Sequence, residues 1–390
     1  MGGYPNIFNY ATKELTQDAM ICWFLECLKS GEGKIRRIGE EFLRAFVFEN
    51  SIDCTNAKLI ECSKQCAKMD VYARVLIDKY YVYPIIFENK TNTFLHGEQL
   101  ERYCDKVYEW FWNNPEKALE NQKKDISDNN CIDSSEIDLS EIQICKIQYV
   151  LFKSSYIFPW EETKFTKRTE KYCEKIDKVG FHLRTLEDMN HFLSRLQTDE
   201  FSIISDYKDY IDEKVKDEKS AENWDEWKNK KAGFEKALNS HLGQWKFFNA
   251  CGAASILCKS DSGVYSVYSI VTKSEEDKSD CNFIDYCFRY GKRKGKKAIY
   301  LQQYRWEKGV TEQSEKEKRQ KEYYELSLVL KNKKSLKTIC DFDSKKDGTD
   351  GKEIFRVIFD DNNTPEKVAE FIKDFAKEFN AILDEVRKKL

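Results

Sequence analysis

The sequence has few histidines and no long apolar segment, and both absences restrict what it can be. Only four of its 390 residues are histidine. Cys62 and Cys66, like Cys22 and Cys27, lack the second pair of ligands that a zinc site requires. We therefore do not expect a zinc enzyme. No apolar stretch approaches the ~18 residues of a membrane span, so we expect no membrane partner.

The amino-terminal segment also lacks the pattern of a secretory signal. Fourteen cysteines without such a signal indicate a reducing, cytoplasmic environment in which the thiols stay free. Hydrophobic residues make up 41% of the chain, with 25 Phe, 21 Tyr and 8 Trp, which is ample for a sizeable core. A chain of this length usually forms two domains, or one large domain with an elaboration.

A strongly apolar segment ends abruptly in charged residues near position 88. The run Val82–Phe87 is followed at once by Glu88, Asn89 and Lys90. Side chains two apart on a strand point to the same face, so Glu88 and Lys90 project together from the strand end. The upstream Asp70, on a neighbouring strand, would complete a carboxylate pair.

Two such carboxylates need a cation. At about 4 Å and an effective dielectric constant of about 20 they repel each other by roughly 4 kcal/mol. A hard divalent metal with oxygen ligands removes this repulsion, and phosphodiester hydrolysis is the reaction that most often needs the arrangement. The alternative is that the strand ends at Phe87 and its last residues enter solvent as an ordinary ion pair. Spacing alone does not decide between the two.

The longer pattern resembles the PD-(D/E)XK nuclease superfamily over about the first half of the chain. An amino-terminal motif is similar to that of a bacterial branch: Thr12-Lys13-Glu14-Leu15-Thr16-Gln17-Asp18-Ala19. In such proteins an Asp, a Glu-x-Lys and a helix with a Gln and a Tyr form the active site. The matching positions are Asp70, Glu88, Lys90, Gln99 and Tyr103. One departure is that the first acid follows Met69 rather than a Pro or Gly.

The resemblance implies a role for each residue at the strand ends. Asp70 and Glu88 would ligate one or two Mg²⁺ or Mn²⁺ ions, with the backbone carbonyl of Asn89 as a further ligand. Lys90 would position the attacking water and stabilise the charge that develops on the phosphate.

The resemblance also implies roles for residues on helices. Gln99 and Tyr103 would orient the metal cluster or hold the phosphate backbone, and ordinary packing on a half-buried helix is the alternative. Glu14 matches an acid of the first helix that touches the metal through water, with Asp18 as second choice. A helix-start charge stabilised by the helix dipole is the alternative for Glu14. Two acids of the second helix also stay open, Glu40 and Glu41.

The resemblance implies an α/β fold in which helices flank a mixed central sheet, a restriction-endonuclease-like core, over residues 1–215. Residues 115–141, rich in Asn, Asp, Ser and Lys, are expected to form a mobile insertion. Periodicity predicts helices at 12–29, 34–49 and 94–112 and strands at 57–61, 69–77, 80–89 and 146–153.

The character of the sequence changes from about residue 216. We expect 216–390 to form an α+β domain that binds substrate or a partner and carries no catalytic group. Its predicted helices are 222–249, 314–331 and 364–388, and its predicted strands are 252–258, 263–272, 283–289, 298–305 and 354–359.

Positive charge is densest in the segment Arg289–Lys297, which we expect to be a basic loop between two strands. Its glycines would let the backbone approach phosphates, and each Lys or Arg contact would add salt-sensitive affinity. The candidate nucleic-acid-binding residues are Lys292, Arg293, Lys296 and Lys297. A solvated hairpin turn is the alternative.

These patterns predict a metal-dependent nuclease with Mg²⁺ or Mn²⁺ as cofactor and DNA as the favoured substrate. The resemblance adds a context in bacterial defence or a mobile element. A non-catalytic module that binds nucleic acid or protein on the same fold, and a ribonuclease, are the alternatives. Self-association or a protein partner through residues 216–390 is open. We expect Asp70→Asn and Glu88→Gln to abolish Mg²⁺-dependent cleavage and to leave folding intact.

Overall fold

The structure is a computed structural model that describes most of the chain. The described residues are 8, 13–91, 98–129, 132, 137–196, 201–229, 238, 240–251, 256–260, 263–272, 284–293, 296–304, 313–337, 339–342, 351–358 and 362–390. For some of them only the backbone is described, namely 13–15, 160, 241, 256–260, 263–272, 284–285, 291–293, 296–298, 304, 314–316 and 351–352. The chain divides into two units, residues 1–215 and 216–390, and each is described by itself.

The first unit is built on a mixed sheet with the strand order β1-β2-β3-β5-β6, in which β4 also pairs with β3. The strands are β1 (Lys58–Lys64), β2 (Val71–Ile77), β3 (Tyr81–Lys90), β4 (Gln143–Ile144), β5 (Ile147–Lys153) and β6 (Val179–Thr185). The first three strands are antiparallel neighbours, whereas β4 and β5 run parallel to β3 and β6 runs parallel to β5. Strand β3 therefore joins the antiparallel half of the sheet to the parallel half.

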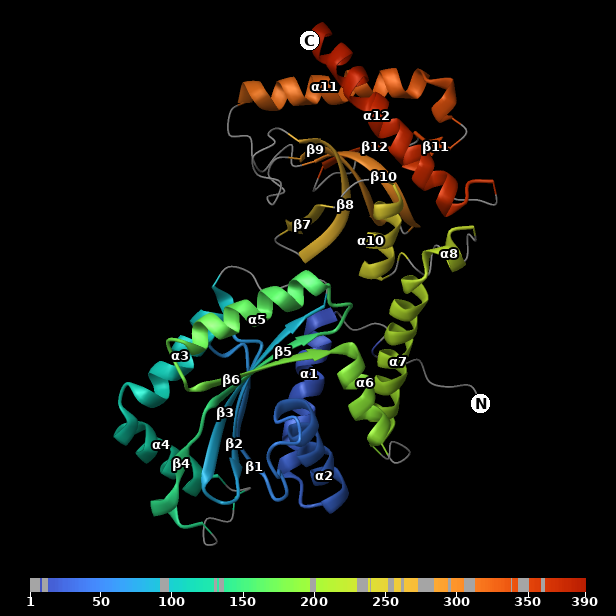
Figure 1. The fold of residues 1–390 in the computed structure, drawn as a ribbon. Helices are drawn as coiled ribbons and strands as arrows, with labels where there is room; N and C mark the ends of the chain where they lie inside the picture. Colours follow the sequence, from blue (N-terminus) through green and yellow to red (C-terminus); the bar gives the residue numbers. More distant parts are fainter. Residues whose placement is uncertain are drawn as a thin grey trace. The chain divides into compact units, whose positions relative to one another are not determined.

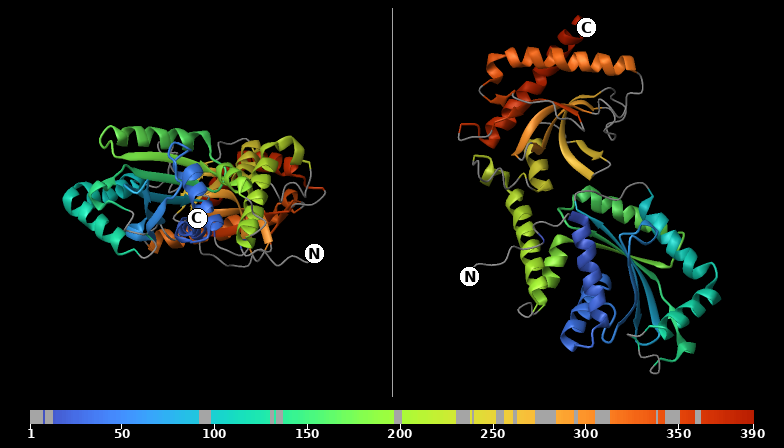
Figure 2. Two further views of the ribbon diagram at one scale, coloured as in Figure 1. Left: turned by 90° about the horizontal axis from the view of Figure 1, so that it is seen from below. Right: turned by 180° about the vertical axis from the view of Figure 1, so that it is seen from behind.

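Helices cover both faces of this sheet, as Figures 1 and 2 show. They are α1 (Lys13–Glu26), α2 (Gly33–Phe42), α3 (Gln99–Trp112), α4 (Pro115–Ser127), α5 (Pro159–Cys173), α6 (Leu186–Arg195) and α7 (Ser202–Glu222). Alternation along β3 separates two cores. Ile85 and Phe87 pack with α1, α2, α6 and α7, whereas Ile86 packs with α3 and α5. The prediction of a mixed sheet flanked by helices is confirmed.

Part of the expected mobile insertion, 115–141, is instead the packed helix α4, so that prediction is wrong for this part. Gln122 and Ile126 of α4 are buried. Arg74 of β2 donates from Nη1 to Gln122 Oε1 at 2.7 Å and to Asp125 Oδ2 at 2.8 Å. These contacts hold α4 against β2. The rest of the segment includes residues outside the described part.

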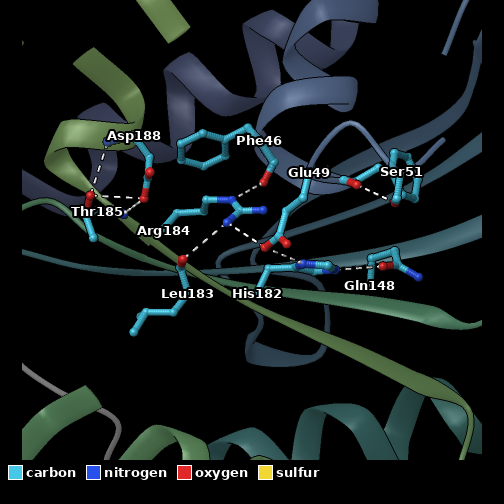
Figure 3. A network of polar contacts seen from close by, with 10 residues as sticks. Phe46, Glu49, Ser51, Gln148, His182, Leu183, Arg184, Thr185 and Asp188 are labelled. Carbon is cyan, nitrogen blue, oxygen red and sulfur yellow. Dashed lines mark hydrogen bonds and ion pairs between the residues drawn. The ribbon is translucent and has the colours of Figure 1, made fainter. Parts of the chain in front are cut away.

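The second predicted helix changes its winding before it ends. Helix α2 continues into a π-helical turn, Leu43–Val47. Arg184 of β6 holds the end of this turn, because its Nε donates to the Phe46 carbonyl at 2.6 Å and its Nη1 lies 2.8 Å from Glu49 Oε1. The Nδ1 atom of His182 lies 3.3 Å from the same Glu49 oxygen (Figure 3). This network fastens the chain after α2 to the edge strand of the sheet.

The second unit contains an antiparallel sheet with the order β11-β12-β10-β9-β8-β7. Its strands are β7 (Ile256–Ser260), β8 (Gly263–Thr272), β9 (Ile284–Arg293), β10 (Lys296–Tyr304), β11 (Cys340–Asp341) and β12 (Gly351–Val357). Its helices are α8 (Trp224–Trp227), α10 (His241–Ala250), α11 (Gln313–Asn332) and α12 (Pro365–Lys389). Within the described part of either unit, no helix has the length and apolar character needed to cross a membrane.

A single helix over 222–249 is not formed, so that prediction is wrong. Helix α7 ends at Glu222, the short α8 follows, and α10 begins at His241.

In the second unit, a buried carboxylate connects the two long helices, α11 and α12, to the sheet. Glu322 of α11 accepts from Tyr286 of β9 at 2.6 Å and from Arg387 Nε of α12 at 2.7 Å.

Candidate active site

Asp70 and Glu88 occupy opposing positions where β2 begins and β3 ends. Val71 pairs with Phe87 in the antiparallel ladder, so the next step of the register sets Asp70 opposite Glu88. Opposing side chains lie on the same face, with Cβ atoms about 5 Å apart. Asp70 Oδ2 accepts the backbone N–H of Asn89 at 2.8 Å, so its carboxylate lies against the peptide that follows Glu88. The structure therefore brings the two predicted acids together.

Glu88 is fully buried, with 0% of its surface exposed. Its Oε1 accepts hydrogen bonds from Lys90 Nζ and from Gln99 Nε2. A carboxylate removed from water needs such partners, because an uncompensated buried charge is strongly destabilising. The Lys90 side chain is only 9% exposed. The alternative in which this strand end enters solvent as an ordinary ion pair is therefore wrong.

Gln99 and Tyr103 form a relay on α3 that fixes the orientation of the Gln99 amide. Tyr103 donates from its hydroxyl to the carbonyl of Lys68 at 2.6 Å, so it must accept from Gln99 Nε2, which lies 3.1 Å away. The same NH₂ group donates to Glu88. Gln99 Oε1 is buried and has no hydrogen-bond partner among the described residues. This oxygen is an available acceptor beside Glu88.

Asn89 points to the other face of β3, toward α1. Its Nδ2 donates to Asp18 Oδ1, and both side chains are buried. Asp18, the second choice for the helical acid, therefore meets Asn89 rather than Glu88. Glu14 lies one turn earlier on α1, but its side chain is outside the described part of the structure. The role of Glu14 stays a prediction.

The two acids of α2 are engaged outside this site. Glu40 Oε1 accepts the backbone N–H of Asn56 at 2.8 Å and Arg36 Nε at 3.2 Å. Glu41 forms an ion pair with Arg44 of the π-helical turn. Because of these contacts, neither acid remains a candidate ligand for the metal.

A second buried ion pair, which was not predicted from the sequence, lies beside the first. Lys153, the last residue of β5, lies next to Lys90 in the parallel ladder. Its Nζ lies 3.0 Å from Glu161 Oε1 in the first turn of α5, and the two side chains are 2% and 1% exposed. Glu161 Oε2 also accepts the Phe158 N–H at 3.0 Å. The sequence pattern that could have indicated this pair is the apolar run of β5, which ends in a lysine. The apolar run before Glu88 ends in charged residues in the same way.

Tyr149 of β5 lies behind the acid pair and makes its surroundings apolar. It pairs with Ile86 in the ladder and is fully buried. Its hydroxyl has no hydrogen-bond partner within the described residues. Burial raises the pKa of Tyr149 well above its ordinary value, and the Glu88 charge raises it further. Charges at this site therefore act in a poorly solvated environment, where electrostatic interactions are strong.

The residues present fit a hard cation that keeps much of its water. No group of three or more His, Cys, Asp or Glu side chains that could hold a metal occurs in the described part of the chain. Mg²⁺ is usually bound by one or two carboxylates and retains several waters. Asp70 and Glu88 supply two carboxylates, and the unpartnered oxygen of Gln99 supplies a further neutral acceptor. The donor set is thus all oxygen and matches magnesium or manganese.

The basic segment of the second unit is a hairpin rather than a loop. Lys292 pairs with Lys297 and Arg293 pairs with Lys296 across β9 and β10, so the prediction that 289–297 is a loop is wrong. Opposing residues share a face, and like charges placed opposite each other are destabilising. The register therefore contains two successive pairs of basic residues, Lys292 with Lys297 and Arg293 with Lys296.

Comparison with known proteins does not assign this arrangement. No family model matches the chain, and no curated protein and no solved structure shows significant similarity to it.

Proposed function

We propose that the chain is a metal-dependent nuclease of the PD-(D/E)XK type, and that its first unit is a restriction-endonuclease-like core. One observation carries the proposal: Asp70, just before the Val71–Phe87 pair, accepts the N–H of Asn89 beside Glu88, and Glu88 is bonded to Lys90 two residues further along the same strand. Two acids and a lysine at the end of a buried strand are the set that the resemblance requires. DNA is the favoured substrate on the same ground.

Each residue then has a role that its contacts support. When bound, Mg²⁺ or Mn²⁺ would polarise the scissile phosphate and lower the pKa of a water molecule. Asp70 and Glu88 would hold the ion, and the backbone carbonyl of Asn89 would assist. Gln99 keeps the Glu88 carboxylate oriented through its NH₂ group.

Lys90 supplies a positive charge that needs no reorganisation during the reaction. It is held against Glu88 in a poorly solvated site, where a fixed cation stabilises negative charge on a phosphate far better than it would in water. With Glu88 engaged as a metal ligand, the Lys90 ammonium would be available to the phosphate and to the attacking water.

A non-catalytic nucleic-acid-binding module on the same fold is the second candidate. The observation in its favour is that Lys90 already neutralises Glu88, as Lys153 neutralises Glu161 in the neighbouring pair. Two buried ion pairs side by side can be purely structural. The resemblance and the opposing Asp70 favour the nuclease.

Cleavage assays decide between these candidates. Purified protein is incubated with supercoiled plasmid, linear duplex DNA, single-stranded DNA and single-stranded RNA, with Mg²⁺, with Mn²⁺ or with EDTA. We expect metal-dependent cleavage of DNA that Lys90→Ala abolishes and that the exposed-site control Lys106→Ala retains. Cleavage of RNA alone would identify a ribonuclease. Binding without cleavage under every condition would support the non-catalytic module.

A further inference from the structure

One face of helix α5 is a row of cations that lines a pocket of about 800 Å³ between α3 and α5. The basic lining residues are Lys164, Lys167, Arg168, Lys171 and Lys175. At about 100° per residue, the first four fall within an arc of about 100° of the helix. Glu162 and Glu170 of the same helix lie outside this arc. The charge is therefore concentrated on the side that faces the pocket.

Two of the three acids that line the pocket, Glu101 and Asp105, already have partners, and the third, Glu98, is an exposed residue just before α3. Glu101 accepts a bidentate ion pair from Arg168, with Nε at 3.1 Å. Burial alone would raise the pKa of Glu101, but the hydrogen bond and the charge of Arg168 lower it below its ordinary value. Asp105 accepts the Tyr172 hydroxyl at 2.8 Å. The α3 wall therefore orients Arg168 and Tyr172.

Three lysines of the α5 wall remain for a ligand. Lys167, Lys171 and Lys175 are exposed and form no hydrogen bond or ion pair with any residue that the structure describes. Lys167 and Lys171 lie about 6 Å apart along α5, and Lys175 follows four residues later, just after the helix ends. A regular row of cations suits a polymer whose anionic groups are regularly spaced.

The topology connects the pocket to the proposed active site. Helices α3 and α5 follow the parallel neighbours β3 and β5, so both begin at the edge of the sheet where Lys90 and Lys153 lie. Both helices lie on the same face of the sheet (Figure 2). Gln99 is the first residue of α3, and Glu161 lies in the first turn of α5. The row of lysines therefore leads away from the site along one helix.

We propose that this pocket binds the phosphate backbone of a nucleic acid, with Lys167, Lys171 and Lys175 contacting phosphates of one strand beside the active site. This rests on the proposed nuclease function and adds a substrate-binding surface to it. From Lys164 to Lys171 the row spans about 10 Å of helix, which corresponds to about three nucleotides of one strand at about 3.4 Å each. Lys175 extends the row beyond the end of α5.

Fluorescence polarisation with a labelled 20-base-pair DNA duplex and the matching single strand, in EDTA to prevent cleavage, tests the proposal. The variant is Lys167→Gln/Lys171→Gln/Lys175→Gln, since Gln keeps the helix propensity of Lys. We expect affinity at least about tenfold weaker at 0.1 M salt, and a log–log salt slope shallower by up to about 2.7 on duplex or about 2.1 on single strand. The control Lys117→Gln/Lys123→Gln/Lys124→Gln removes the same charge from α4, none of which lines the pocket, and should match the wild type.

The outcomes separate this proposal from the nuclease assignment. Equal affinity and salt slope for the pocket variant and the α4 control would overturn the pocket proposal, whether or not the protein cleaves. Loss of binding in the pocket variant of a protein that never cleaves would support the pocket and refute the nuclease. Displacement of the DNA by polyglutamate at equal charge concentration would show that the pocket takes acidic polypeptides, and would overturn the proposal.

Discussion

Lys90 lies beside Lys153 across the parallel pair formed by β3 and β5. Each ammonium group is bonded to its own buried carboxylate, Glu88 and Glu161 respectively. Two neighbouring cations in a poorly solvated site are tolerated only while both carboxylates stay in place, because each unpaired charge would be destabilising. The two ion pairs therefore lie side by side at the ends of β3 and β5, although their acids come from different elements.

The stability of the Lys153–Glu161 pair can be measured directly. We expect Glu161→Gln to lower the free energy of unfolding by about 3 kcal/mol, because it removes the carboxylate that lies 3.0 Å from the buried Lys153 ammonium. The double variant Lys153→Met/Glu161→Leu should recover most of this loss, since it removes both charges at similar volume. Urea unfolding gives both values. A single variant as stable as the wild type would show that Lys153 finds another counter-charge.

Asp70→Asn and Glu88→Gln should both abolish Mg²⁺-dependent cleavage but differ in stability. Asn at position 70 can still accept the Asn89 N–H, so we expect little change in the free energy of unfolding. Glu88→Gln removes the carboxylate that is bonded to the buried Lys90 ammonium, so we expect a loss of about 3 kcal/mol rather than intact folding. Cleavage assays and urea unfolding test the two variants. The control Asp78→Asn, in the turn before β3, should keep both activity and stability.

Tyr103→Phe tests whether the α3 relay positions Glu88. The substitution removes the hydroxyl that Gln99 and Lys68 share, and we expect a loss of about 1–2 kcal/mol of stability. Cleavage should fall about tenfold at saturating substrate, which corresponds to about 1.4 kcal/mol of barrier. Tyr108→Phe on the same helix is the control. Equal cleavage by the two variants would mean that the relay is packing alone.

His182 should make stability depend on pH. Burial lowers its pKa below the ordinary value of 6.5, and the Arg184 charge adds to this against the opposing effect of Glu49. Folding therefore favours the neutral ring, so this contribution is complete above about pH 6.5 and is lost as the pH falls below it, by up to about 1.4 kcal/mol per pH unit. His182→Gln should flatten the slope of unfolding free energy between about pH 5 and 6.5. The exposed-site variant His191→Gln should keep the wild-type slope.

A separate prediction concerns the basic residues of the hairpin formed by β9 and β10 in the second unit. Replacing Lys292, Arg293, Lys296 and Lys297 with Ser should weaken nucleic-acid binding for all sequences. The salt slope should become shallower by up to about 0.9 for each lost duplex phosphate contact. Because opposing like charges are removed, thermal stability should hold or rise, which distinguishes lost contacts from unfolding. An unchanged affinity and slope would mean that the hairpin tip is simply solvated.

Strand β3 and its neighbours could be predicted because their sequence signals are local. A central strand buried on both faces reads as a continuous apolar run, and the run before Glu88 is of this kind. The short turn between β2 and β3 fixes their register, which in turn sets Asp70 opposite Glu88. The acid pair follows from that register alone.

Helix α4 and the second ion pair could not be read in the same way. The sequence of α4 is polar, and its buried positions include a glutamine, Gln122, so composition favoured a loop. The sequence nevertheless contains a signal for the start of α4, because Asn114 caps the helix and Pro115 follows it. The partner of Lys153 lies beyond a turn, and only the packing of α5 on the sheet shows that it is Glu161. The charged ends of β9 and β10 were missed because alternation of apolar residues stops before the strands do.

The parallel arrangement of β3 and β5 has an electrostatic consequence that does not depend on any side chain. Helices α3 and α5 both begin at the edge of the sheet that carries Lys90 and Lys153. The backbone dipoles of a helix add up to about half a positive charge at its amino terminus. Two such termini give this edge a standing positive potential that neither pH nor mutation of a lysine removes. Even with Lys90 replaced, the edge would keep part of its attraction for phosphate oxygens.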